Sequence, residues 1–109
     1  MPIEKQIKTK TFTIPTSPTE ILRGFGDYGY VAKIVEMHIR NPSTTSKAEV
    51  YLYDTTPDGT TDILVKKIVV DEDSYVILNE EDLKAKFNYA IKISCNISGV
   101  EASMVIEVE

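Results

Sequence analysis

The sequence predicts an all-β protein, folded as a single antiparallel β-sandwich of jelly-roll or Ig-like type with seven or eight strands. Apolar residues recur at every second position in several segments, as they do in strands with one buried face. Turn residues separate these segments at intervals of roughly 10 residues, which is typical of sandwiches rather than of parallel sheets with crossover helices. The alternation is clearest at Val50 and Leu52, at Tyr89, Ile91, Ile93 and Cys95, and at Ala102, Met104, Ile106 and Val108.

The sequence predicts a flexible terminus over residues 1–6, followed by one domain over residues 7–109. Residues 7–14 are rich in Thr and β-branched side chains, which favours a first strand. Pro15 and Pro18 end this strand, because proline has no N–H to donate to a strand ladder.

Residues 19–23 predict a short edge strand, and residues 24–29 predict a glycine-rich loop. Three glycines within this loop indicate backbone positions with positive φ. We expect the two aromatic residues of the loop, Phe25 and Tyr28, to be exposed, because so flexible a segment does not bury them.

Residues 30–40 form the longest predicted strand. Strict alternation divides its side chains between two faces, and both faces are apolar near the start of the strand. One face holds Val31, Lys33, Val35, Met37 and Ile39, and the other holds Tyr30, Ala32, Ile34, Glu36, His38 and Arg40.

Residues 48–53 and 63–70 predict a hairpin. Between them, Pro57 pre-sets φ for the turn, Asp58 tolerates the next position, and Gly59 takes the left-handed position that follows. The first of these strands places Ala48, Val50 and Leu52 on one face and Glu49, Tyr51 and Tyr53 on the other.

The C-terminal third predicts three more strands, over residues 74–78, 89–95 and 101–108. Residues 80–87 are the only helix-like stretch, with Asn79 as its N-cap and acidic residues in its first turn. This stretch forms either one helical turn or a loop.

The composition limits the binding partners. The chain has 109 residues, of which 12 are basic and 17 acidic, and a formal net charge of -5. This balance disfavours nucleic-acid binding, although Lys8, Lys10 and Lys33 are candidates for a local basic patch. No apolar stretch reaches the roughly 18 residues of a membrane helix, and the N-terminus lacks an apolar signal core. We therefore expect a protein that is made in the cytoplasm and does not bind a membrane.

The sequence predicts no enzyme activity, no cofactor and no metal ion. The one cysteine, Cys95, lies in phase with an apolar strand face, which favours a small buried side chain. The one histidine, His38, cannot alone form a transition-metal site or complete a nucleophilic triad. We favour an exposed or half-buried strand residue for His38, and a surface network with Glu36 and Arg40 is the alternative.

Acidic residues leave two other kinds of site open, a calcium site and a glycosidase active site. Asp54, Asp58 and Asp62 surround the hairpin turn, but their spacing matches a calcium-binding loop only weakly. The acids at 71–73 and 80–82 lie in predicted turns, where solvated side chains are favoured over the facing pair that a glycosidase needs.

The tyrosines are the remaining residues that suggest a function. If the apolar face of strand 48–53 is buried, Tyr51 and Tyr53 face outward, where they suit a protein interface or sugar stacking. The alternative is cross-strand stabilisation of a solvent-exposed sheet face. With Phe25 and Tyr28 of the glycine-rich loop, these residues are the predicted interface.

The chain resembles a group of small all-β virion proteins of tailed phages over residues 30–109. The resemblance lies in the residue types of four strands, which read KAEVYLYD at 47–54, ILVKKIVV at 63–70, SYVIL at 74–78 and YAIKIS at 89–94. The segment 80–86 departs from the group, which more often has a glycine-bearing turn at this point.

The resemblance implies a structural component of the virion: a capsid decoration protein, or a head, neck or tail accessory protein. Such a protein binds other virion proteins, and we expect it to form homo-oligomers. The second hypothesis is a small carbohydrate-binding module, which the exposed tyrosines favour and the absence of Trp disfavours. The third is a small hydrolase that uses acidic residues with His38.

Overall fold

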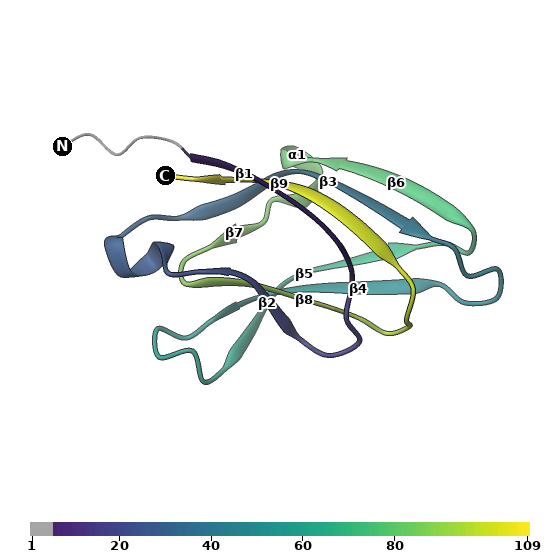
Figure 1. Cartoon of the computed structure of the whole chain (residues 1–109), viewed down its shortest axis with the longest axis horizontal. Coiled ribbons are helices and arrows are strands. Elements are labelled where there is room, and N and C mark those ends of the chain that lie inside the picture. The colour runs from purple at the N-terminus through teal and green to yellow at the C-terminus, as the bar shows by residue number, and fades with distance from the viewer. Residues whose placement is uncertain (1–5) are drawn as a thin grey trace.

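The computed structural model describes residues 6–109, which form a sandwich of two antiparallel sheets, as the sequence predicts. Sheet A, the upper layer in Figure 1, has the strand order β1-β9-β3-β6, with the short β7 beside β3. Sheet B, the lower layer, has the order β2-β8-β4-β5. The strands of the described residues are β1 (Gln6–Thr13), β2 (Thr19–Arg23), β3 (Ala32–Asn41), β4 (Ala48–Thr55), β5 (Asp62–Val70), β6 (Ser74–Asn79), β7 (Lys86–Phe87), β8 (Ala90–Cys95) and β9 (Glu101–Val108).

The strand pairs are nested along the chain. Strand β4 pairs with β5, β3 with β6, β2 with β8, and β1 with β9, all antiparallel. The chain therefore forms one long double strand whose successive pairs alternate between sheet B and sheet A. This nesting is the jelly-roll arrangement, one of the two that the sequence allowed. Gln6 already belongs to β1, and the rest of the predicted flexible terminus lies outside the described residues.

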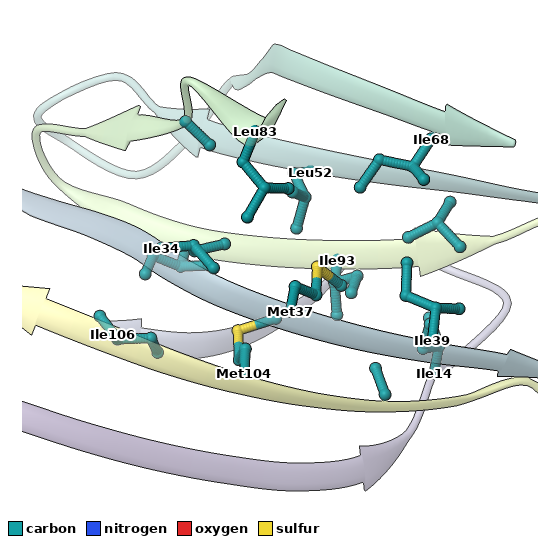
Figure 2. Close-up of a cluster of buried hydrophobic side chains, with 14 of the residues drawn as sticks. Ile14, Ile34, Met37, Ile39, Leu52, Ile68, Leu83, Ile93, Met104 and Ile106 are labelled. Carbon is teal, nitrogen blue, oxygen red and sulfur yellow. The ribbon is translucent and has the colours of Figure 1, made fainter. Parts of the chain in front are cut away.

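The core lies between the sheets. Met37 of β3 and Met104 of β9 are opposite each other in sheet A, and they pack with Ile93 of β8 from sheet B (Figure 2). Each of the three is at most 1% exposed, and burying a side chain of this size stabilises the fold by about 1.5–3 kcal/mol. Cys95 is 1% exposed, which confirms the prediction that it is a buried small residue.

A β-bulge in β3 overturns the predicted division of that strand into two faces. Ile34 is opposite Ile106 of β9, but Glu36 is opposite Val105, so Val35 is an extra residue without a partner on β9. The bulge reverses the alternation. As a result, Ala32 and Ile34 face the core before the bulge, and Met37 and Ile39 face it afterwards.

The predicted turns are confirmed. Gly59 adopts a φ of 76° in the β4–β5 hairpin, the left-handed position that the turn requires. Helix α1 (Glu80–Leu83) is a single turn capped by Asn79. Asn79 Oδ1 accepts from the N–H of Asp82 at 2.9 Å, and Asp82 Oδ2 accepts from the N–H of Asn79 at 3.1 Å. No helix in the described part of the chain is long and apolar enough to span a bilayer.

Candidate functional site

The tyrosine pair lies on the outer face of sheet B. Val50 and Leu52 are fully buried, so the alternation of β4 turns Tyr51 and Tyr53 away from the core, as predicted. Their rings stack, with centroids 6.4 Å apart and an interplanar angle of 25°. Both side chains are half-buried by their neighbours on the sheet.

Polar neighbours hold this pair in place. The hydroxyl of Tyr53 lies 3.1 Å from Oγ of Ser94 on β8. Nζ of Lys67 on β5 lies 5.7 Å from the ring centroid of Tyr51 and 3.0 Å from Oε1 of Glu49. The hydrogen bond to Glu49 raises the pKa of Lys67, and the carboxylate charge adds to the effect. These contacts stabilise the sheet across strands, and they leave part of each ring open to a partner.

The two loop aromatics lie in different environments. The glycine-rich loop forms a single turn of 3₁₀ helix, η1 (Phe25–Tyr28), and Gly24 and Gly29 on either side adopt φ values of 95° and 77°. This turn buries Phe25 to 6% exposure, so the prediction that Phe25 is exposed is wrong. Tyr28 is 78% exposed, as predicted.

A groove of about 310 Å³ runs beside η1, between β1 of sheet A and β2 of sheet B. Tyr28 and Tyr30 lie along it with ring centroids 6.2 Å apart, and Lys8 and Arg23 give it positive charge. The other lining residues are Gln6, Leu22, Gly24, Phe25 and Val108.

The two sheets differ at their edges. In sheet B, each edge strand carries a bulge: Ile21 is the extra residue on β2 and Val65 is the extra residue on β5. In sheet A, β1 pairs with β9 and β6 pairs with β3 without any shift in register. Bulges and charges on an edge strand hinder pairing with another chain, whereas a straight edge presents its unpaired N–H and C=O groups in a regular row.

Strand β6 lacks the features that protect the other edges. It reads SYVILN and contains no charge, proline or glycine. Tyr75 and Ile77 project from the outer face of sheet A and are 53% and 57% exposed. Val76 and Leu78 face inward and pack on the core. This composition is typical of strands that pair with another chain.

His38 lies in a surface network on the same face as Tyr75. Its Nδ1 contacts the hydroxyl of Tyr75, and its Nε2 lies 3.4 Å from Oε1 of Glu36. Arg40 pairs with Asp73 instead of joining this network. The half-buried position of His38 confirms the favoured prediction, and of the alternative network Glu36 contacts His38 but Arg40 does not. Sequence reasoning missed Tyr75, because the pairing of β3 with β6 brings it beside His38.

The three aspartates that suggested a calcium site do not converge. Asp54 is buried and accepts hydrogen bonds from backbone amides, including that of Asn88 at 2.7 Å. Asp58 accepts from residues of its own turn, and Asp62 pairs with Lys92 at 2.7 Å. Among the described residues, no group of three or more His, Cys, Asp or Glu side chains could hold a metal ion.

Lys33 is separated from the other two lysines of the suggested basic patch. Lys33 lies 2.8 Å from Glu80 and 3.8 Å from Glu107. The hydrogen bond to Glu80 raises the pKa of Lys33, against a smaller opposing effect of burial. Lys8 and Lys10 lie on β1, on the side of the strand that faces sheet B.

Comparisons with known proteins give the fold. No family model matches the chain, and no curated protein matches it in sequence. A solved structure of Bacillus endospore appendages, described as a novel family of disulfide-linked pili, is similar over 96% of this chain and 84% of that one, with 13% identity and a TM-score of 0.55. At this identity the similarity shows a shared β-sandwich fold.

Proposed function

We propose that the chain is a non-enzymatic structural protein that binds copies of itself and other structural proteins in a larger particle. The sequence resemblance supports a phage virion as that particle, with the chain as a capsid decoration protein or a head, neck or tail accessory protein. The pilus structure with the same fold is a precedent for assembly by such a sandwich, in another kind of particle.

The observation that carries this proposal is the straight, uncharged edge strand β6. Its outer face exposes Tyr75 and Ile77, and its backbone pairs with β3 on one side alone among the described strands. Pairing with another chain would satisfy the outward N–H and C=O groups and cover both apolar side chains.

Light scattering on a sizing column at two protein concentrations tests the proposal. We expect species larger than the monomer, in a fraction that rises with concentration. Ile77→Lys should shift them toward the monomer, because a lysine on an edge strand opposes pairing. Leu64→Lys on the bulged edge of sheet B is the matched control, since Leu64 is 56% exposed and Ile77 is 57% exposed. A monomer at both concentrations that also fails to bind purified phage capsids or tails would contradict the proposal.

The groove beside η1 supports a second candidate function, carbohydrate binding. Tyr28 and Tyr30 present two aromatic faces along a groove of about 310 Å³, and sugars stack on such faces. A glycan array with the wild type and with Tyr28→Ala tests it. A glycan that binds the wild type but not Tyr28→Ala would favour this function. An array on which the wild type binds no glycan would reject it.

A further inference from the structure

We propose that copies of this chain join head to tail through sheet A, with β6 of one copy pairing antiparallel with β1 of the next. This inference rests on the proposed function and names its partner, a second copy, and its interface. The result would be one continuous sheet that crosses from copy to copy, and such a contact propagates into a ring or an open filament.

Strand direction allows this contact when the next copy is turned with the twist of the sheet, and neither copy has to be turned over. Along the order β1-β9-β3-β6, every neighbouring pair is antiparallel. Strand β6 therefore runs opposite to β1 of its own copy. A copy displaced sideways along sheet A brings its β1 beside β6 in the antiparallel orientation, with inner faces matched to inner faces. Strands β1 and β6 are also the two edge strands without a bulge.

Charge favours this pairing over the symmetric alternatives. Strand β1 contains Lys8 and Lys10 and no acid, whereas β6 is uncharged and lies between acidic segments at 71–73 and 80–82. Two β6 strands in antiparallel pairing would bring these acidic segments together, and two β1 strands would bring lysines together. The mixed pair avoids both repulsions, because β6 itself carries no charge, and the avoidance of like charges selects partners.

The lysines of β1 are not held by other side chains. Lys8 and Lys10 form no ion pair with another described residue. On β1 the two lysines face inward, opposite the buried Ile106 and Met104 of β9, at an edge where their long side chains reach solvent.

The length of the strands fixes the register. Side chains on matching faces must be opposite each other, and all six residues of β6 must find partners within Gln6–Thr13. One register meets both conditions. It places Tyr75 opposite Thr11 of the next copy and Ile77 opposite Thr9 of the next copy. The resulting outer row combines two exposed apolar residues with threonines, which have high β propensity.

A cysteine pair tests this register directly. Thr11 and Tyr75 are both exposed, so the double variant Thr11→Cys/Tyr75→Cys should fold as the wild type does. Directly opposite residues on antiparallel strands lie within disulfide range, about 4.5–5.5 Å between Cα atoms. We expect mild oxidation to convert the double variant into a ladder of covalent oligomers on a non-reducing gel. The native Cys95 is 1% exposed, so the wild type should remain uncrosslinked.

Three controls decide between the alternatives. The pair Thr13→Cys/Tyr75→Cys is displaced by one position on the same face and should cross-link far less. Ile77→Cys alone would form dimers if two β6 strands paired about Ile77, and Thr9→Cys alone would do so if two β1 strands paired about Thr9; either result would overturn the inference. A wild type that assembles while the double variant yields no ladder would also overturn it and leave the proposed function standing, whereas a wild type that stays monomeric and binds no particle contradicts both.

Discussion

The carboxylate of Asp54, in β4, accepts a hydrogen bond from the backbone N–H of Ala90, the first residue of β8, at 3.1 Å. The same carboxylate accepts from the N–H of Asn88 at 2.7 Å, of Tyr89 at 3.1 Å and of Thr55 at 2.7 Å. Asp54 is 6% exposed, so four backbone donors in a partly buried region depend on one side chain. This arrangement attaches the segment between β7 and β8 to the end of β4.

Asp54→Ala should lower the free energy of unfolding by about 1.5–3 kcal/mol, the usual cost of removing hydrogen bonds to a charged acceptor. Urea denaturation monitored by circular dichroism measures this change. Asp62→Ala is the matched control, because Asp62 forms a surface ion pair with Lys92 at 2.7 Å, and such pairs contribute about 0–1 kcal/mol. Equal losses in the two variants would show that the backbone contacts of Asp54 add nothing.

The sequence was enough to predict the sandwich, most strand positions and the hairpin at Gly59, because each depends on local alternation and turn residues. It also predicted Asn79 as a helix cap, for the same reason. The role of Asp54 was not predictable, since three of its four donors lie 34–36 residues further along the chain. Together with Asp58 and Asp62, Asp54 therefore suggested a calcium site on a weak match of spacing.

The bulge at Val35 shows a second limit of sequence reasoning. Residues 32–39 contain apolar residues in both phases, which strict alternation interpreted as two partly apolar faces. The register with β9 resolves this pattern into a single buried face with one extra residue. The features that distinguish the edges of sheet A from those of sheet B are also tertiary, because a strand becomes an edge only once its neighbours are known.

Two glycines of the η1 region should respond differently to substitution by alanine. A Cβ on Gly26 would lie 2.2 Å from the backbone oxygen of Asn88 and 2.9 Å from the ring of Tyr89. A Cβ on Gly29 would meet nothing within 4 Å, but the φ of 77° disfavours any residue with a side chain. We expect Gly26→Ala to cost about 3 kcal/mol, as severe overpacking does, and Gly29→Ala about 1 kcal/mol from backbone strain. Thermal unfolding of both variants measures the difference, and a larger loss for Gly29→Ala would show that the backbone of Asn88 yields readily.

The carboxyl group of Asp58, in the β4–β5 hairpin turn, should have a pKa below the usual value for an aspartate. The carboxylate of Asp58 accepts from the hydroxyl of Thr56 at 2.6 Å and from the hydroxyl of Thr60 at 2.9 Å. These hydrogen bonds, that of Thr56 first, favour the charged form and hold the pKa of Asp58 below its usual value of 3.8. Because the pKa is lower in the folded state, the stabilisation is fully present above pH 3.8 and is lost as the pH falls through the lowered pKa. NMR titration of the Asp58 carboxyl carbon should therefore give a pKa below 3.8, and Thr56→Val should move it upward. Thr11→Val on β1 should leave it unchanged, and a wild-type value at or above 3.8 would contradict the assignment of these hydrogen bonds.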